Sequence, residues 1–374
     1  MKWVFWLSAA LIAYAYIGYA GWLWLRSRKN PRPVRRSQQQ PAVSIVMIVR
    51  NEEAWIDKKL RNLFEVDYPP SRFQIIVVSD GSTDRTNAIM REHAYRQRML
   101  VVENHLPRGK ASGLNDALPL AEAEIVVFTD ARQRIEPGAI RLLMENFGDP
   151  EVGCVSGALM LGDPDAGEID KGLSLYWRTE KKIRELESKS GSTVGATGAL
   201  YAVRRELLSE IPEGTILDDV FIPMQVVRRG KRAIFDSRAR AWDIAHAGRD
   251  REFARKVRTL SGNFQLVQLA PWILSGSNPL LARFISHKLM RLIVPFALTA
   301  MFVASLCLKT PIYRAALILQ LAFYSLGAVA LVRLPKPKVL ARAADAAGTF
   351  MLLNSAAVIA FLNFVSGRKI AWSR

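Results

Sequence analysis

The sequence predicts an α/β fold, with an open sheet of mainly parallel strands, and membrane-spanning helices at both ends of the chain. Two observations indicate the sheet. Runs of β-branched residues alternate with helical segments between residues 42 and 250, and several of these runs stop at an aspartate. A third observation indicates the membrane helices, because long charge-free stretches gather at the two ends of the chain.

Residues 3–25 form a charge-free stretch that predicts a transmembrane anchor over residues 1–25. A helix needs about 20 apolar residues to cross a bilayer, and this stretch is longer than the core of a signal peptide. Tryptophans at both of its ends are typical of a membrane–water interface. Residues 26–41, rich in arginine, proline and glutamine, predict a basic tether to the next domain.

Three more apolar stretches lie near the C-terminus, at residues 292–308, 315–332 and 346–367. Asn354 and Asn363 interrupt the last one, which makes it the weakest. Four spans would place the C-terminus outside, although Arg368, Lys369 and Arg374 lie there, so the last stretch is either re-entrant or interfacial, or it spans the membrane and these charges are tolerated. Residues 290–374 are therefore expected to form a membrane region with two spans and this third segment. Residues 251–289 are basic and amphipathic, which predicts interfacial helices just before that region.

The net charge of +18 arises from 52 basic and 34 acidic residues. The basic residues gather beside the apolar stretches, at residues 26–36, 283–291 and 333–342. This positive-inside pattern predicts a multi-pass protein of the inner or plasma membrane, with its central domain in the cytoplasm. No nucleic-acid-binding module is visible, so the expected partner of this charge is the lipid bilayer and not a nucleic acid.

Residues 73–86 contain the pattern around which the central domain is organised. Residues 75–78 are an unbroken β-branched run, typical of a parallel strand buried on both faces. The run stops at Asp80, and Ser82 or Thr83 is expected to cap the helix that follows. A carboxylate at the C-terminal end of a parallel strand lies where an open α/β sheet binds its ligand. Asp80 is therefore expected to accept hydrogen bonds from a base or a ribose.

Carboxylates recur along the chain, at Asp80, at Asp130 and at the pair Asp218 and Asp219. The first two are predicted at the ends of neighbouring parallel strands, so they can converge on one ligand. A nucleotide diphosphate needs a clamp for its base, a cation on its phosphates and a base for the attacking hydroxyl. Asp80, Asp130 and Asp219 can fill these roles in turn. Lys110, on a predicted loop, can reach a phosphate as a point charge.

Five motifs follow one another between residue 44 and about residue 265. They are Ile48-Val49-Arg50-Asn51-Glu52, Ser79-Asp80-Gly81-Ser82-Thr83-Asp84, Arg108-Gly109-Lys110-Ala111, Thr129-Asp130-Ala131 and Leu217-Asp218-Asp219. In order and type they resemble the motifs of membrane-bound family-2 glycosyltransferases, the group that contains hyaluronan, cellulose and poly-N-acetylglucosamine synthases. The resemblance implies a cytoplasmic domain with the Rossmann-like glycosyltransferase A fold over residues 42–250.

The resemblance also implies an inverting glycosyltransferase that uses a nucleotide-sugar donor, most often a UDP-sugar, and a hydroxyl of a glycan or lipid-linked acceptor. Asp219 matches the carboxylate that deprotonates the acceptor, and is the expected catalytic base. The expected cofactor is Mg²⁺ or Mn²⁺, with Asp130 as its ligand. The expected donor-binding residues are Asn51, Glu52, Asp80, Lys110, Asp130 and Arg258.

The sequence departs from the family pattern in two places. Arg132 stands where the metal motif has its second aspartate, so either Arg132 replaces part of the cation's charge or the metal gains another ligand, such as His246. Processive synthases carry a Gln-x-x-Arg-Trp motif, of which residues 255–259 keep only Arg258.

Three functions therefore stay open from the sequence. The first is synthesis of an exopolysaccharide or other glycan. The second is a single, non-processive sugar transfer to a lipid or lipid-linked acceptor, because the tryptophan on which a growing acceptor would stack is missing. The third, from another class, is a catalytically weak scaffold subunit of a polysaccharide export complex, motivated by Arg132 in the metal motif.

Overall fold

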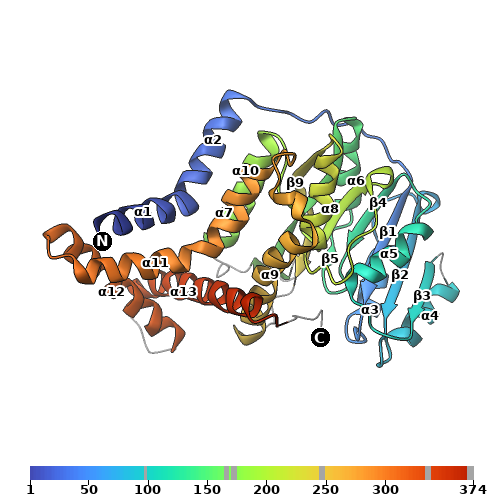
Figure 1. Cartoon of the computed structure of the whole chain (residues 1–374). Helices are drawn as coiled ribbons and strands as arrows, with labels where there is room; N and C mark the ends of the chain where they lie inside the picture. The colour runs from blue at the N-terminus through green and yellow to red at the C-terminus, as the bar shows by residue number, and fades with distance from the viewer. Residues whose placement is uncertain (97–98, 164–167, 170–174, 244–248, 333–337, 369–374) are drawn as a thin grey trace. The chain divides into compact units, whose positions relative to one another are not determined.

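The computed structural model describes the chain except for residues 97–98, 164–167, 170–174, 244–248, 333–337 and 369–374. Outside these gaps the chain divides into two compact units (Figure 1). Apart from the gaps just named, the helical unit contains residues 1–22, 249–264, 282–332 and 338–368, and the sheet unit contains residues 23–243 and 265–281.

The sheet unit is built on one mixed sheet, whose described strands follow the order β3-β2-β1-β4-β8-β6-β9-β5, with β7 paired to β6. The strands β1 to β4 are mutually parallel, whereas β8 runs antiparallel to both β4 and β6. The predicted α/β fold is therefore confirmed, with β8 reversed inside the sheet and the short strands β5 and β7 antiparallel to β9 and β6. The strand bounds are β1 (Val43–Val49), β2 (Phe73–Asp80), β3 (Met99–Asn104), β4 (Ile125–Thr129), β5 (Arg134–Ile135), β6 (Val152–Asp163), β7 (Glu168–Ile169), β8 (Leu200–Arg204) and β9 (Arg232–Asp243).

Helices connect these strands and cover the sheet. Every residue of β1 and of β4 is buried, which explains why their sequences are continuous apolar runs rather than alternating ones. The apolar core continues from these strands into the helices on either side, through residues such as Leu60 of α3 and Leu143 of α6. The helices of this unit are α3 (Ile56–Phe64), α4 (Thr86–Arg96), α5 (Lys110–Ala117), α6 (Ala139–Glu145), α7 (Leu175–Lys189) and α8 (Asp218–Arg228).

The predicted cap of α4 is wrong. The helix begins at Thr86, and its first backbone N–H donates to Asp84 Oδ1 at 3.0 Å. Ser82 and Thr83 instead lie in the turn after β2, where Ser82 Oγ accepts a hydrogen bond from the backbone of Asn51 at 3.1 Å. Aspartate and serine side chains are equally good acceptors for the first N–H groups of a helix. The sequence therefore offered Ser82, Thr83 and Asp84 as possible caps.

Residues 31–41, the centre of the predicted tether, form a segment that we call the strap. The strap is extended and is bound along the sheet unit. The guanidinium of Arg232 donates to the carbonyl of Arg32 at 2.8 Å, and the backbone of Ser37 donates to the carbonyl of Glu145 at 2.9 Å. Its end is held by Tyr68, whose hydroxyl donates to the Pro41 carbonyl. The strap is thus part of the folded unit rather than a free linker.

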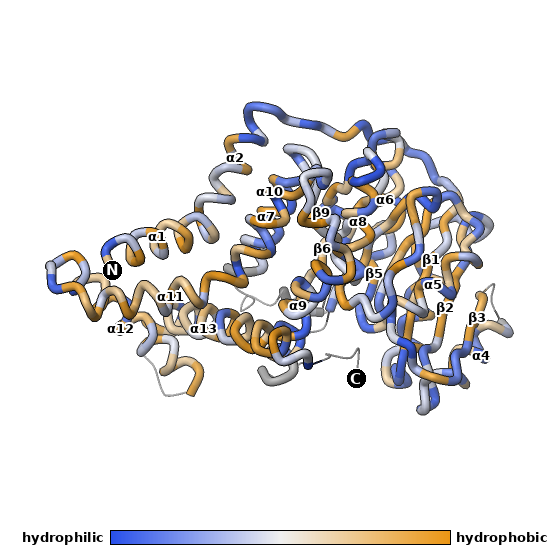
Figure 2. Tube along the Cα trace, viewed as in Figure 1, coloured by the Kyte–Doolittle hydropathy of each residue, from blue (hydrophilic) through white to orange (hydrophobic). Residues whose placement is uncertain are grey.

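Among the described residues, four helices are long and apolar enough to cross a membrane, by length and composition. They are Lys2–Lys29, Leu281–Cys307, Pro311–Leu331 and Leu340–Val365. Figure 2 shows hydrophobic colouring along α11 (Met290–Cys307), α12 (Pro311–Leu331) and α13 (Lys338–Val365). The last of the four lies in α13 (Lys338–Val365), a continuous helix of 28 residues, so the asparagines do not break it. The helix of the second begins at Leu281, eleven residues before the charge-free stretch that predicted it, because α10 (Leu281–Phe284) and a π-helical turn run on into α11 (Met290–Cys307).

The contact between the strap and Gly148 can be tested by adding a methyl group at this glycine. A Cβ there would lie 2.3 Å from Ser37 Oγ and 3.0 Å from Ser37 N, so Gly148→Ala must displace the strap. Gly138→Ala is the matched control, because the nearest atom to its Cβ would be 3.5 Å away. We expect trypsin to cut after Arg35 and Arg36 faster in the first variant only. Equal cleavage rates in the two variants would contradict the binding of the strap at this point.

Candidate functional site

The candidate site lies at the C-terminal edge of the parallel strands, where Asp80 ends β2 and Asp130 follows β4. The prediction that these two strands are neighbours is wrong, because β1 lies between them and pairs with both. The chain builds β1, β2 and β3 in one direction and then crosses back to place β4 on the other side of β1. Such a reversal of strand order opens a crevice at the strand ends, which is where open α/β sheets bind ligands.

Lys110 is the residue on which the carboxylates of the site converge. Its Nζ lies 3.1 Å from Asp130 Oδ1 and 3.1 Å from Asp218 Oδ2. Burial alone would lower the pKa of Lys110, but the negative charges of Asp130, Asp218 and Asp219 outweigh it and raise this pKa above its ordinary value. The ammonium therefore stays protonated at neutral pH and joins three segments of the chain.

Lys110 was predicted on a loop, and this prediction is wrong. It is the first residue of α5, its side chain is only 16% exposed, and the two ion pairs fix its position. The turn before it is held by Asp80, which is fully buried and accepts hydrogen bonds from the backbone N–H groups of Arg108 at 2.7 Å and Gly109 at 2.9 Å. Asp80 thus directs Lys110 towards the site, and its contact with a base or ribose stays a prediction.

Asp130 and Asp219 approach each other at Gly198. A Cβ on this glycine would lie 3.4 Å from Asp219 Oδ2 and 3.8 Å from Asp130 Oδ2. The absence of a side chain therefore leaves both carboxylates facing the same small space. The loop that carries Gly198 is tied to the start of α8, because Ala196 N donates to the carbonyl of Asp219 at 2.6 Å.

The two adjacent aspartates at the start of α8 differ in their surroundings. Asp218 is 3% exposed, and its Oδ2 binds the Lys110 ammonium and accepts a hydrogen bond from the Tyr201 hydroxyl at 3.4 Å. Asp219 is partly exposed and lies beside the open face of Gly198. Within the pair, Asp219 is therefore the carboxylate that a bound acceptor can reach.

Asp130 has the features of a cation ligand beside a diphosphate. Its side chain is 39% exposed, Oδ1 binds Lys110, and Oδ2 has no hydrogen bond to any described residue. Mg²⁺ usually takes one or two protein carboxylates and completes its shell with water and substrate phosphates. Among the described residues no group of three or more Asp, Glu, His or Cys side chains could hold an ion by itself. The residues present thus fit a cation that is shared with a ligand's phosphates.

The structure describes two of the three remaining candidate residues, Arg132 and Arg258. Arg132 Nε is shielded from solvent and has no hydrogen-bond partner in the described part of the chain, which suits a site that receives an anion. Arg258 lies on α9 (Arg249–Leu269), within the helical unit, so its contact with a diphosphate stays a prediction. His246, the alternative metal ligand, lies outside the described residues.

Asn51 and Glu52 hold the turn that follows β2. Asn51 Oδ1 accepts a hydrogen bond from Thr83 N at 2.8 Å, and Glu52 N donates to Thr86 Oγ1 at 2.8 Å. Asn51 is exposed and has a φ of 52°, a left-handed conformation that asparagine adopts more easily than most residues. Both residues therefore fix the chain next to Asp80, and their direct contact with a donor stays a prediction.

Lys59, on α3, was not among the predicted site residues. Its side chain is buried, and its Nζ donates to Thr129 Oγ1 at 2.8 Å and to the Gln133 carbonyl at 2.6 Å. These acceptors lie on either side of Asp130 and Arg132, so Lys59 holds together the two ends of the loop that carries them. Burial lowers the pKa of Lys59 to about 7, against the opposing charge of Asp130.

A signal for Lys59 was present in the sequence. It lies three residues after Ile56 and four before Leu63, on the side of α3 that faces the core. A lysine in the middle of an apolar helix face either reaches back to solvent or has buried oxygen acceptors. The sequence could not show which acceptors, because Thr129 and Gln133 are about seventy residues away.

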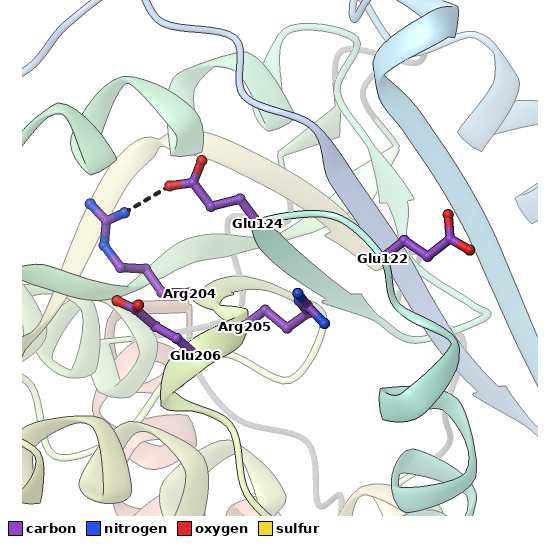
Figure 3. Close-up of a pocket in the computed structure, with 5 residues that line it drawn as sticks. All are labelled: Glu122, Glu124, Arg204, Arg205 and Glu206. Atoms are coloured by element: carbon purple, nitrogen blue, oxygen red, sulfur yellow. Dashed lines mark hydrogen bonds and ion pairs between the residues drawn. The ribbon is translucent and has the colours of Figure 1, made fainter.

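A separate hollow of about 330 Å³ lies at the opposite edge of the sheet (Figure 3). Glu124, at its wall, precedes β4, whereas Asp130 follows that strand. Arg204 donates to Glu124 Oε1 at 3.1 Å across the hollow, so part of its charge is paired internally. The hollow is thus distinct from the carboxylate cluster, and its lining residues are Glu122, Glu124, Arg204, Arg205 and Glu206.

Comparison with known proteins agrees with this geometry. Residues 44–212 match the family model described as glycosyl transferase family 2. The chain carries a family-2 glycosyltransferase domain. The matched range includes Asp80, Lys110 and Asp130, and it ends shortly before Asp218 and Asp219, so the cluster extends beyond the matched part of this glycosyltransferase domain.

Two kinds of curated relative align with the glycosyltransferase domain. Beta-monoglucosyldiacylglycerol synthase of Trichormus variabilis is 28% identical over 199 residues, which are 51% of this chain and 42% of that protein. Poly-beta-1,6-N-acetyl-D-glucosamine synthase of Staphylococcus epidermidis is 31% identical over 241 residues, 63% of this chain and 58% of that protein. The chain therefore spans less than two thirds of the length of these relatives.

A solved structure resembles the whole fold. Mannosyltransferase PcManGT from Pyrobaculum calidifontis, in complex with GDP-Man and Mn²⁺, has a TM-score of 0.72 to this chain at 24% sequence identity. The match covers 98% of this chain and 99% of the other. With the family match, it confirms the predicted glycosyltransferase A fold with apolar helices at both ends.

Lys59→Met should destabilise the glycosyltransferase domain, because the buried Gln133 carbonyl loses its donor. The expected loss is about 1–3 kcal/mol of the free energy of unfolding. Lys58→Met is the matched control on the same helix, since Lys58 is exposed, and its expected effect is within about 0.5 kcal/mol. Thermal unfolding in detergent measures both. Equal melting temperatures would show that Lys59 does not hold the loop of Asp130.

Proposed function

We propose that the protein is an inverting glycosyltransferase that moves a sugar from a nucleotide-diphosphate donor to a hydroxyl acceptor at a cell membrane. The observation that carries this proposal is the convergence of Asp130, Asp218 and Asp219 on Lys110. Gathering several charges in a partly buried place seldom stabilises a fold, so such clusters point to function. The family-2 domain match supports the same reaction class.

The donor, for which we propose a UDP-sugar, would lie across the ends of β2, β1 and β4. Its base and ribose would be near Asp80, and its diphosphate would be near Lys110 and Arg132, which offer positive charge. A divalent cation, Mg²⁺ or Mn²⁺ on Asp130, would supply the charge that stabilises the departing diphosphate. Asp130 fits that ion because one of its oxygens has no hydrogen bond to a described residue.

Asp219 would act as the catalytic base. Its carboxylate takes the proton of the acceptor hydroxyl, and the oxygen forms a bond to the anomeric carbon while the bond to the nucleotide diphosphate breaks. Attack from the side opposite the leaving group inverts the configuration at that carbon. Asp218 is less suited to this role, because it is buried against Lys110 and Tyr201.

A single transfer to a lipid or lipid-linked acceptor is the form of this reaction that we favour. Residues 255–259 lack the tryptophan of processive synthases. The relatives that align with the domain include beta-monoglucosyldiacylglycerol synthases, whose name denotes a glycolipid product. A purely scaffolding role would not require a partly exposed Asp219 beside Asp130, so we place it last.

The test of the function is direct. The full-length protein in lipid nanodiscs is incubated with a panel of radiolabelled nucleotide sugars and extracted lipids, with and without Mg²⁺ or Mn²⁺. Label in a product of single-sugar size supports the proposal, and a polymer ladder supports the processive alternative. No transfer from any donor, with no binding of UDP, would refute the transferase assignment.

Asp219→Asn should lower turnover by roughly two to four decades, the contribution of a general base, while the affinity for UDP is unchanged. Asp67→Asn is the control, because Asp67 is an exposed carboxylate whose described ion pair is with Arg141. Initial rates give the turnover, and calorimetry with UDP gives the affinity. Near-normal turnover of Asp219→Asn would remove Asp219 from the role of base.

A further inference from the structure

Lys181, on α7, has an ammonium group with an unusual partner. Its Nζ donates to Met160 Sδ at 3.0 Å, and no described oxygen accepts a hydrogen bond from it. A thioether sulfur is a weak acceptor, whereas an ammonium carries three strong donors. Glu185, one turn along the same helix, binds Lys182 at 3.2 Å instead. Among the described residues, Lys181 is therefore a partly buried cation without the oxygen acceptors that an ammonium group favours.

A second cation lies close to it. Burial lowers the pKa of Lys181, and the guanidinium of Arg240 in β9 lowers it further, against the opposing charge of Glu185. Arg240 is 47% exposed, and its described ion pair, with Glu136, is long at 3.9 Å. Glu136 already accepts a hydrogen bond from Trp242 Nε1 at 2.7 Å. Two neighbouring cations repel each other, and an anion bound between them would offset this repulsion.

The position of the two cations follows from the register of the sheet. β6 pairs with β9 so that Ala158 lies opposite Arg240 and Met160 lies opposite Trp242. β6 runs in the same direction as β4, because β8 is antiparallel to both. Met160 thus lies beyond the level of Thr129, at the edge of the sheet where Asp130 begins. Lys181 and Arg240 are at the edge that carries the carboxylates.

Arg184 links the two cations to the carboxylate cluster. It lies one turn after Lys181 on α7, and its Nη1 donates to Thr197 Oγ1 at 2.5 Å. Thr197 is the residue before Gly198, against which Asp219 and Asp130 lie. The donor residues Asp80 and Lys110 belong to the β2–β1–β4 side of the sheet, whereas Arg240 is separated from β4 by β8 and β6.

We propose that Lys181 and Arg240 form a subsite for a phosphate group of the acceptor, so that this protein glycosylates a phosphate-bearing molecule. The subsite rests on the proposed function and names the class of its acceptor. A lysine supplies a mobile point charge and an arginine supplies a planar fork, a combination that suits a phosphate. A phosphate held there would leave the acceptor's hydroxyl to approach Asp219 from the side of Gly198, away from the donor residues.

Binding of a simple probe pair tests the subsite. The probes are decyl phosphate and decanol, which share a chain and differ in the phosphate, and the protein is full-length in phosphatidylcholine nanodiscs. We expect wild type to bind decyl phosphate at least about tenfold more tightly than decanol, the scale of one charge-assisted hydrogen bond. Lys181→Met and Arg240→Met should each lose most of this preference. Lys182→Met, the matched control on α7, should keep it.

Glycerol 3-phosphate distinguishes the two sources of such a phosphate. If it binds as tightly as decyl phosphate, the subsite holds and the acceptor is a soluble phosphate ester. If it binds much more weakly, the subsite holds and the acceptor is a lipid phosphate. Equal affinity of wild type for decyl phosphate and decanol would overturn the proposal.

A second measurement uses wild type alone, so it does not depend on the folding of any variant. Lysines are acylated with and without decyl phosphate, and the labelled sites are read by mass spectrometry. Protection of Lys181 but not of Lys182 supports the subsite, and absence of protection at Lys181 overturns it. UDP binding is measured on the same sample, so that the two proposals can fail separately. If UDP does not bind, the transferase function is refuted. If UDP binds but decyl phosphate is not preferred over decanol, only the subsite is refuted.

Discussion

The arrangement of the site depends on one interaction, the contact of the Lys110 ammonium with Asp130, just after β4, and with Asp218, at the start of α8. The carboxylates gathered around Lys110 repel one another. Without the ammonium between them, one carboxyl group would take up a proton or the segments that carry them would move apart. Lys110 can make the contact because Asp80 holds the turn before α5 through two backbone N–H groups. The end of one parallel strand thus positions the cation that gathers the carboxylates of two other segments.

A second set of contacts supports the loop of Asp130. Lys59 bonds to both ends of that loop, and Thr129 Oγ1 donates onward to the Ala199 carbonyl at 2.8 Å, next to Gly198. The loop and the Gly198 segment are therefore joined beneath the carboxylates. In the proposed reaction, the donor's diphosphate would become the new partner of Lys110, and a divalent cation would become the new partner of Asp130. The ion pair between Lys110 and Asp130 would then be replaced by contacts with the ligand.

Much of this could be predicted from the sequence, because it depends on local pattern. The apolar run of residues 75–78 and the aspartate after it indicate a buried strand and a ligand-facing end without any knowledge of the rest of the chain. The same reasoning located Asp130. The pair at Asp218 and Asp219 could be identified as the start of a helix with carboxylates in its first turn, and the structure confirms that helix.

The parts that could not be predicted depend on distant residues. The place of β1 between β2 and β4 is set by which strands pair, and no local pattern encodes it. The ion pairs of Lys110 join residues up to about a hundred positions apart, so an isolated lysine after a glycine was expected on a loop. The strap has the composition of a linker, and its hydrogen bonds with distant residues such as Arg232, Glu145 and Tyr68 show that it is bound.

The pH dependence of stability in Lys110→Met tests the role of Lys110 most directly. The melting temperatures of the variant and of wild type are compared from about pH 5 to about pH 8, without nucleotide or metal. Without the ammonium, mutual repulsion raises carboxyl pKa values in the folded state, so the folded variant binds more protons than the unfolded chain and loses stability as pH rises. We expect a deficit in melting temperature relative to wild type that widens as the pH rises. A deficit that is the same at every pH, or no deficit, would contradict the central role of Lys110.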